Sequence, residues 1–264
     1  MLLVDAFKKV HHHIALIFIP IMYDLLSFVI GWSIVGMDGK ERTSIRLILE
    51  MGLPSVSHVS NIPLFANNID LLNSPKLPSY TWLIIIMMIV IGAFLQGGYI
   101  RYLYSIVSGK TFNFSQFLQF GKNNWLQFIF LGIIILLGKI SVTGFLVLMF
   151  NMIGVFAALV FFICMRILLI YLEFTIVVDR VSIAAALKLT RGYLKNSLLL
   201  SFTLIFIMYT TSSLISFLIH WFWGPLMMVG SVFIYGYVMS VIQTLFMTIL
   251  CRTKNKMTNV VKAA

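Results

Sequence analysis

Long apolar stretches dominate the chain and recur at intervals that fit membrane-spanning helices. They cover residues 14–36, 81–101, 125–178, 197–221 and 226–250. A helix needs roughly 20 consecutive apolar residues to cross the hydrocarbon core of a bilayer. Lipid offers the backbone no hydrogen-bonding partner, so stretches of this kind must be helical. The pattern therefore predicts an all-α, polytopic transmembrane helical bundle.

The stretch at residues 125–178 is too long for one span and fits two helices joined by a tight turn. Asn151 and Gly154 are turn-forming residues near its middle, so we place the break near Phe150 and Asn151. The division gives six predicted spans: about 14–36, 81–104, 125–149, 152–178, 197–221 and 225–250.

The positive charges between the spans predict the side that each loop faces. With a cytoplasmic N-terminus, thirteen of the 19 Lys and Arg residues lie on the inner side, four lie outside and two fall within spans. This excess favours a cytoplasmic position for both termini. With a net charge of +11, we expect a bacterial cytoplasmic membrane protein whose basic face meets an anionic inner leaflet. We expect no nucleic-acid binding, because no folded basic domain is present to hold a duplex.

The largest segment outside the predicted spans is residues 37–80, which we place as an outer loop. Its first part, residues 39–51, has the periodicity of a short interfacial helix, with Arg42, Arg46 and Glu50 on one stripe. Its second part is rich in Pro and Asn and is expected to be irregular.

Two short amphipathic segments precede spans on the predicted inner side. Residues 113–124 have apolar positions at helical spacing, and residues 181–196 carry a basic stripe formed by Lys188, Arg191 and Lys195. We expect each segment to lie at the interface as an elbow helix and then to turn into the bilayer.

The two elbow segments and the span pairs that follow them predict an internal repeat, 112–179 and 180–250, within a single membrane domain. The sequences FSQFLQFGKNNW (114–125) and SIAAALKLTRGYLKN (182–196) resemble a group of bacterial six-helix membrane proteins. That group includes the membrane domain attached to some glycerophosphoryl diester phosphodiesterases. The resemblance implies architecture over about 112–250. It lends no catalytic residues, because the phosphodiesterase domain of that group is soluble.

Asp24 and Lys139 are the two charges placed deepest in the predicted spans. Charges at such depth cost at least about 3 kcal/mol each on insertion scales, so they usually face the bundle interior or a cavity. We expect an Asp24–Lys139 ion pair between the first and third spans. Its role is either a structural clasp or a translocation or proton-relay site. The other reading is a protonated Asp24 and a Lys139 that extends toward the interface.

Arg166 and Glu173 are seven residues apart, so they share one helix face near the inner end of the fourth span. We expect them to anchor the span at the interface or to bind lipid phosphate. Together with Lys188, Arg191 and Lys195, they form the candidate inner-interface charges.

The sequence carries no signature of an enzyme or of a bound cofactor. It has no Gly-rich phosphate loop, HExxH zinc motif or nucleophile elbow. The three adjacent histidines, residues 11–13, point in different directions on a helix and do not predict a metal site. We therefore expect no enzymatic activity, no cofactor and no metal.

Two classes of function fit these observations. The first is a membrane protein that acts through a protein partner, as an envelope or immunity-type factor. The alternative is a transporter or a permease subunit that needs a separate ATPase, with Asp24 and Lys139 near the translocation path. The internal repeat and the deep charges favour a carrier within that alternative.

Overall fold

The computed structural model describes residues 2–36, 49–60, 65–66, 78, 80–222 and 224–263. The described residues form helices and contain no β-strand. The helices are α1 (Leu2–His12), α2 (Ala15–Val35), α3 (Val56–Val59), α4 (Thr81–Val107), α5 (Phe114–Phe150), α6 (Met152–Leu168), α7 (Leu172–Asp179), α8 (Ile183–Asn196), α9 (Leu198–Trp221) and α10 (Pro225–Ala263).

Six segments are long and apolar enough to cross a membrane: α2, α4, α5, the α6–α7 segment, α9 and residues 225–258 of α10. They confirm the predicted all-α polytopic bundle, and the chain is a multi-pass membrane protein. The ends of α2, α4, the α6–α7 segment and α9 lie within three residues of those expected, because apolar runs of this length leave helix as the only structure stable in lipid. In contrast, α5 begins eleven residues earlier than expected and α10 extends beyond residue 250.

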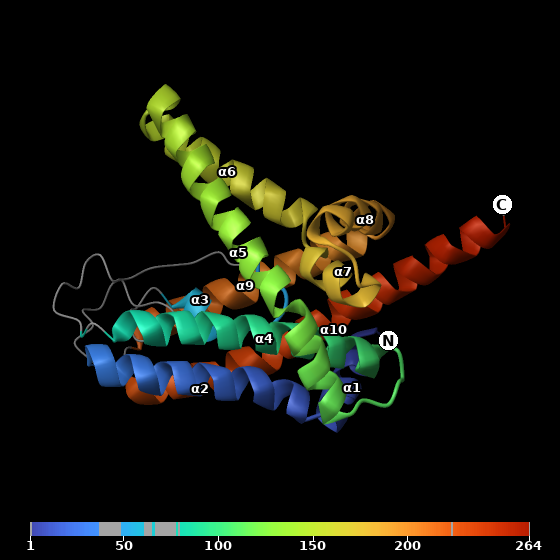
Figure 1. The fold of residues 1–264 in the computed structure, drawn as a ribbon, viewed down its shortest axis with the longest axis horizontal. Coiled ribbons are helices and arrows are strands. Elements are labelled where there is room, and N and C mark those ends of the chain that lie inside the picture. Colours follow the sequence, from blue (N-terminus) through green and yellow to red (C-terminus); the bar gives the residue numbers. More distant parts are fainter. Residues whose placement is uncertain are drawn as a thin grey trace.

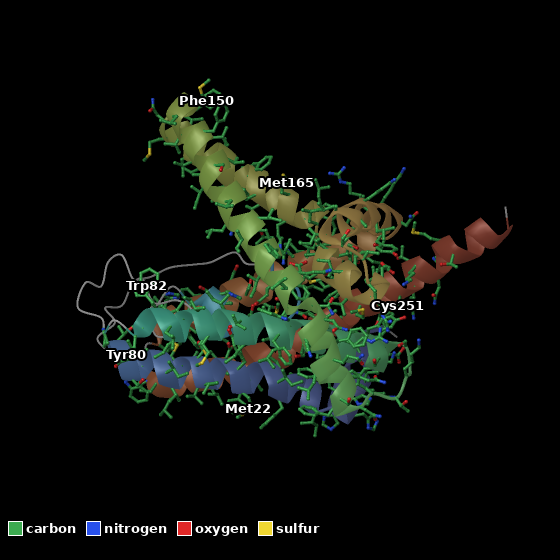
Figure 2. All side chains as sticks on the ribbon, in the orientation of Figure 1. Met22, Tyr80, Trp82, Phe150, Met165 and Cys251 are labelled. Carbon is green, nitrogen blue, oxygen red and sulfur yellow. The ribbon has the colours of Figure 1, made fainter. Side chains whose placement is uncertain are left out.

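The central bundle consists of α2, α4, α9 and α10 (Figure 1). α10 packs against α2, α4 and α9, and α2 packs against α4. α1 and the C-terminal part of α10 lie at one end of this bundle. α2 ends and α4 begins at the other end, where Tyr80 and Trp82 are exposed (Figure 2).

α5 and α6 form a hairpin that leaves the bundle at an angle, with Phe150 at its tip (Figures 1 and 2). Its apolar side chains are mostly exposed, including Leu148 and Phe156. The turn between the two helices is tight, because Gly154 lies directly against the backbone of Leu146.

The elbow helices differ from the expectation in one respect. Residues 114–124 continue without a break into the span and form the first part of the single helix α5. The second elbow, α8, is separate from α9, with Ser197 between them. An amphipathic segment can extend a span directly when no breaking residue divides them, and residues 114–150 contain no proline.

α1 is a helix that the sequence analysis did not predict. Its Ala6 and Val10 are buried, and it packs against α10. The Lys9 ammonium donates a 3.3 Å hydrogen bond to the carbonyl of Val107 at the end of α4. The chain before the first span therefore covers one end of the bundle.

Candidate functional site

A stretch of the predicted outer loop, residues 49–60, lies inside the bundle. Eleven of its twelve residues are buried, and His58 is the exception. Its short helix α3 packs against α9 and α10. Because α2 ends and α4 begins at the same end of the bundle, we describe residues 49–60 as the re-entrant segment. The prediction that all of 37–80 is an outer loop is therefore wrong for these residues. The expected helix at 39–51 is not present over 49–51, and its other residues lie outside the described ranges.

Hydrogen bonds to neighbouring helices show how deeply the re-entrant segment enters. Ser216, five residues before the end of α9, donates to the carbonyl of Val59 at 3.2 Å. Gln96 approaches the carbonyl of Met51 at 3.5 Å, and it lies fifteen residues into α4. At 1.5 Å per residue, these contacts lie about 8 Å from the end of α9 and about 22 Å from the start of α4. The segment therefore runs from the end of the bundle where α2 ends and α4 begins to its middle.

The local sequence explains this conformation. Gly52 has a φ of 102°, in the left-handed region that L side chains rarely adopt. A Cβ at this position would also lie 2.5 Å from the Gln96 amide. Ser55 is the N-cap of α3 and accepts a 3.3 Å hydrogen bond from the Ser57 amide. Gly52 and the Ser55 cap thus turn the chain. A larger residue at position 52 would not fit beside Gln96.

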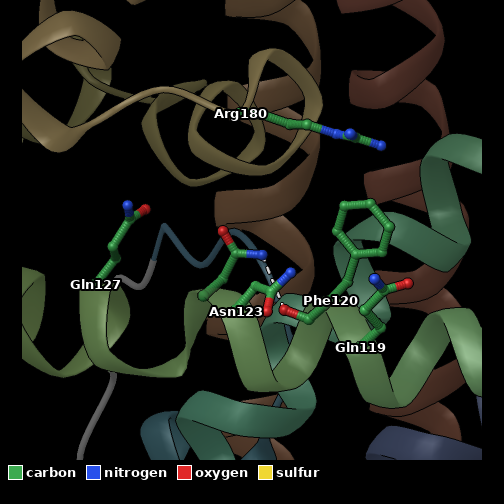
Figure 3. A pocket seen from close by; sticks show the side chains of 6 residues that line it. Gln119, Phe120, Asn123, Gln127 and Arg180 are labelled. Atoms are coloured by element: carbon green, nitrogen blue, oxygen red, sulfur yellow. Dashed lines mark hydrogen bonds between the residues drawn. The ribbon is translucent and has the colours of Figure 1, made fainter.

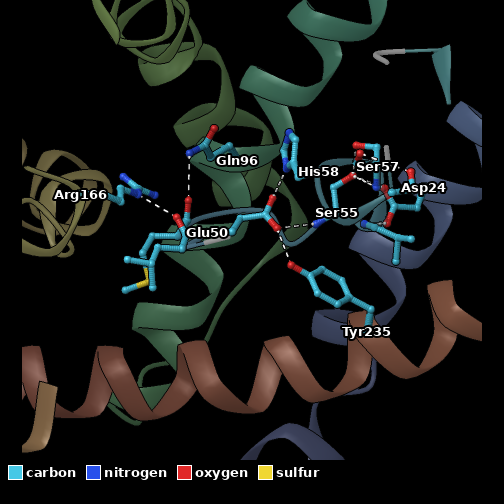
Figure 4. A network of polar contacts seen from close by, with 12 residues as sticks. Asp24, Glu50, Ser55, Ser57, His58, Gln96, Arg166 and Tyr235 are labelled. Atoms are coloured by element: carbon cyan, nitrogen blue, oxygen red, sulfur yellow. Dashed lines mark hydrogen bonds and ion pairs between the residues drawn. The ribbon is translucent and has the colours of Figure 1, made fainter. Parts of the chain in front are cut away.

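Glu50 is the centre of a buried polar network (Figure 4). One carboxylate oxygen lies 2.5 Å from Nδ1 of His58. The other oxygen accepts hydrogen bonds from the hydroxyl of Tyr235 at 2.9 Å and from the amide of Ser55 at 3.2 Å. The Glu50 side chain is 8% exposed and the His58 side chain is 52% exposed. A buried carboxylate is therefore joined to a half-exposed imidazole.

Asp24 belongs to the same region and is 1% exposed near the middle of α2. Its carboxylate accepts hydrogen bonds from the Ser55 hydroxyl and from the Val56 amide, the latter at 2.6 Å. The Ser55 hydroxyl also lies 2.7 Å from that of Ser57. Ser55 therefore connects the two carboxylates, because its amide binds Glu50 and its hydroxyl binds Asp24.

The predicted Asp24–Lys139 pair does not form in the structure. Asp24 binds the re-entrant segment, whereas Lys139 is exposed on the hairpin. Hydrogen bonds from Ser55 and Val56 satisfy the Asp24 carboxylate within the bundle, so it needs no lysine partner. The positions of Asp24 and Lys139 along their helices place them at similar depths in the membrane. These positions do not show that the α5–α6 hairpin projects away from the bundle and carries Lys139 with it.

Arg166 and Glu173 do form a pair, with 2.5 Å between Nη1 and Oε1. The pair bridges the break between α6 and α7. The Arg166 Nε donates to the carbonyl of Leu49 at 2.8 Å, which ties the hairpin to the start of the re-entrant segment. The second oxygen of Glu173 is buried without a hydrogen-bond partner. Anchoring at the interface and lipid binding by this pair stay predictions.

Lys188, Arg191 and Lys195 are exposed on α8 and lie apart from the buried network. The opposite face of α8 packs inward through Tyr193, whose hydroxyl donates to Asp179 at 3.0 Å. Burial, together with the Asp179 carboxylate, raises the pKa of Tyr193, so this hydroxyl stays protonated and can donate. The basic stripe is thus free to meet an anionic surface.

The sequence analysis assigned Glu50 to an interfacial stripe and singled out neither His58 nor Tyr235. A signal was present in the stretch LEMGLPSVSHVS (49–60), where apolar residues alternate with Ser around a Gly-Leu-Pro turn. Irregular backbone with apolar residues between two spans is typical of segments that line transporter sites. The proline and asparagine content of the surrounding loop obscured this signal.

The half-exposed His58 lies against the buried Glu50 carboxylate and connects it with the surface of the bundle. Imidazole is the side chain whose ordinary pKa lies nearest to neutral pH. Within the described residues, no group of three or more His, Cys, Asp or Glu side chains is arranged to hold a metal ion. The fold and the site thus define a multi-pass membrane protein with a re-entrant segment and two buried carboxylates. No protein-family model, curated protein or solved structure matches the chain. The resemblance to membrane domains of glycerophosphoryl diester phosphodiesterases stays a prediction.

Proposed function

We propose that the protein is a proton-coupled secondary carrier. The observation that carries the proposal is the Glu50 carboxylate, which is buried in the middle of the bundle beside the half-exposed His58. Ionisable groups within the membrane are costly to insert, and they commonly mark ion pathways and proton relays. Transport, rather than enzymatic catalysis, is the activity that such a pair supports.

The irregular backbone of the re-entrant segment adds to the support. Non-helical backbone at membrane depth is tolerated where it is buried in protein or lines a cavity. In secondary carriers, such interruptions near the midplane form the site for substrate and coupling ion. We place the coupling proton on Glu50 and His58, with Asp24 as the second carboxylate. Lys139 has no part in this pathway, because it is exposed on the hairpin.

We further propose that the protein lies in a bacterial cytoplasmic membrane with both termini in the cytoplasm. The excess of Lys and Arg at that end supports this orientation. The exposed basic stripe of α8 (Lys188, Arg191 and Lys195) would then lie against the anionic inner leaflet.

Proton flux driven by an added substrate, measured in proteoliposomes, tests the proposal. The purified protein is reconstituted in acid-loaded vesicles that contain a pH-sensitive dye. Na⁺, K⁺, Li⁺, Ca²⁺, pooled amino acids, pooled sugars and pooled organic cations are then added in turn. We expect at least one of these additions to change the internal pH, and Glu50→Gln to abolish the change. Lys139→Met is the matched control, because it removes a charge from the hairpin and should transport as the wild type does.

Two results would contradict the carrier. One is a wild-type protein that gives no proton flux with any of these additions. The other is a Glu50→Gln variant that transports at the wild-type rate. Folding of each variant is checked by size-exclusion chromatography in detergent before reconstitution, so that loss of flux reports on the carboxylate.

The second candidate function is binding to a partner protein in the membrane. The partner would be a toxin, if this protein confers immunity, or a separate ATPase subunit. The hairpin favours it, because its apolar surface extends away from the bundle and Leu148 is 85% exposed. A photo-crosslinking residue at position 148 in native membranes should then give a discrete protein adduct. Position 199 on α9, which is 79% exposed, is the control for chance collisions. Adducts with lipid alone would count against this candidate.

A further inference from the structure

A polar cavity lies apart from the buried network, between α5 and the end of α7 (Figure 3). Its volume is about 270 Å³, and its lining residues are Gln119, Phe120, Asn123, Asn124, Gln127 and Arg180. This volume is just below that of typical sites for drug-sized ligands, so the cavity suits a small ion or the polar end of a larger molecule. Four of its six lining residues carry side-chain amides, which donate hydrogen bonds.

Two guanidinium groups lie against the ring of Phe120, one from the lining residue Arg180 and one from Arg101 on α4. The guanidinium carbon of Arg101 is 4.4 Å from the centre of the Phe120 ring, and that of Arg180 is 5.1 Å from it. Cation–π contacts hold both groups against this part of the cavity wall. Two like charges that share one aromatic ring repel each other, and an anion between or beside them would relieve the repulsion.

Neither guanidinium has an acidic partner in the described part of the chain. The Nε of Arg101 is buried and makes no hydrogen bond within the described residues. Buried polar groups are normally satisfied by a partner. An oxyanion near the shared ring of Phe120 would supply an acceptor to this unpaired donor and a counter-charge to both guanidinium groups.

The backbone at Arg180 points to the same role. Arg180 caps α7 in the left-handed conformation, with φ 54° and ψ 47°. Glycine and asparagine are the residues that usually occupy such a position, because a Cβ is disfavoured there. An arginine held in this conformation directs its side chain over Phe120 at the cavity (Figure 3).

We propose that this cavity binds an oxyanion of phosphate type, held by Arg180 with the side-chain amides and balanced by the charge of Arg101. Arginine suits this role, because its planar fork donates two parallel hydrogen bonds to phosphate oxygens. The oxyanion is either free phosphate or the headgroup of an anionic phospholipid. The proposal does not depend on the proposed carrier, since it concerns different residues and a binding step alone.

Binding measurements on the full-length protein in detergent test the proposal. Calorimetric titration with inorganic phosphate tests the free anion. Native mass spectrometry after nanodisc reconstitution with phosphatidylglycerol, and separately with phosphatidylcholine, tests the lipid headgroup. We expect Arg180→Gln to weaken the bound species by about 10- to 100-fold, the range for loss of charged hydrogen bonds. Arg101→Gln should weaken it less. Arg252→Gln removes an exposed charge from α10 and should leave binding unchanged.

The outcomes separate the sources and decide the proposal. Phosphate binding in the absence of lipid assigns the cavity to a free anion. Retention of phosphatidylglycerol alone, lost in Arg180→Gln, assigns it to a headgroup. Should Arg180→Gln fail to fold, Arg180→Lys and Asn123→Ala replace it and are expected to weaken binding too. The proposal is overturned if the wild type binds neither species, or if the cavity variants bind as tightly as Arg252→Gln.

Discussion

Tyr235 on α10 donates a 2.9 Å hydrogen bond to the carboxylate of Glu50, which lies 185 residues earlier in the chain. Tyr235 is fully buried, so no water replaces a donor lost at this position. We expect Tyr235→Phe to lower the free energy of unfolding by about 1.5–3 kcal/mol, the range for hydrogen bonds to charged groups. Reversible unfolding in detergent, followed by tryptophan fluorescence or circular dichroism, measures this change.

Tyr237→Phe is the matched control for that variant. Tyr237 is half-buried two residues further along α10, and its ring packs near that of Phe7 without a hydrogen bond from its hydroxyl in the described chain. The free energy of unfolding of Tyr237→Phe should stay within about 0.5 kcal/mol of the wild-type value, as for most substitutions that leave no buried group unpaired. Equal losses from the two substitutions would mean that the Tyr235 hydroxyl does not bind Glu50.

The burial of the re-entrant segment can be tested by cysteine labelling. Leu53 is 7% exposed, and Asp24 holds the segment through Ser55 and Val56. With Cys164 and Cys251 replaced by Ser, a cysteine at position 53 should resist a membrane-impermeant maleimide. Asp24→Leu removes both hydrogen-bond acceptors, and we expect it to raise the labelling rate at position 53 by at least about tenfold, because each lost acceptor leaves a buried donor unpaired.

A cysteine at Tyr80 gives the reference rate for this experiment. Tyr80 is 59% exposed at the start of α4, outside the packed core. The position-80 cysteine should be labelled rapidly both with Asp24 present and in the Asp24→Leu variant. A position-53 cysteine that reacts as fast as the position-80 cysteine in the wild type would place the segment outside the bundle.

The spans could be predicted from the sequence because one physical requirement dominates them. Backbone groups in lipid must bond within their own helix, so each apolar run gave a helix, although α5 and α10 extend beyond the apolar runs that predicted them. The turn at Asn151 was equally readable. Asn151 has a φ of 50°, and asparagine is one of the few non-glycine residues enriched at positive φ.

The candidate site could not be predicted in the same way, because it depends on contacts between distant segments. Glu50 lies in a stretch whose periodicity indicates an interfacial helix at the edge of a loop, and nothing local reveals that Tyr235 approaches it. Asp24 was singled out by its depth in the first span, and it is buried in the structure. Its partner was not predicted, because depth alone does not distinguish a lysine on a projecting hairpin from a serine on a re-entrant segment.

The crossing of α4 and α5 depends on the absence of a side chain at Gly121. A Cβ there would lie 2.9 Å from the carbonyl oxygen of Phe94 and 2.9 Å from its ring. The backbone oxygen can move only if the helices separate, so we expect Gly121→Ala to cost about 1–3 kcal/mol of stability. Gly132→Ala on the same helix is the control, because nothing lies within 4 Å of its added Cβ. It should be neutral or slightly stabilising, since alanine favours the helix. Thermal unfolding in detergent compares the two, and equal effects would exclude close packing at Gly121.

Lys254 on α10 joins the end of α7 to α8 through a shared carboxylate. Its ammonium pairs with one oxygen of Asp179, and the Tyr193 hydroxyl binds the other. The lysine side chain is 33% exposed and the aspartate side chain 9%, so solvent screens the pair only in part. We expect Lys254→Met to cost about 1–2 kcal/mol, between the values for exposed and buried pairs. Lys256→Met on the same helix is the control. Lys256 is exposed, so this substitution should cost less than about 0.5 kcal/mol of stability.

A double-variant cycle shows whether Lys254 acts through Asp179. In an Asp179→Asn background the ammonium has lost its charged partner, so Lys254→Met should then cost less than half of its effect in the wild-type chain. Unfolding at low and high salt is a second test. Added salt screens the ion pair, so it should reduce the difference in unfolding free energy between the wild type and Lys254→Met. Additive losses in the cycle would show that Lys254 stabilises α10 by packing of its methylene groups, and the ion pair would then contribute little to joining α7, α8 and α10.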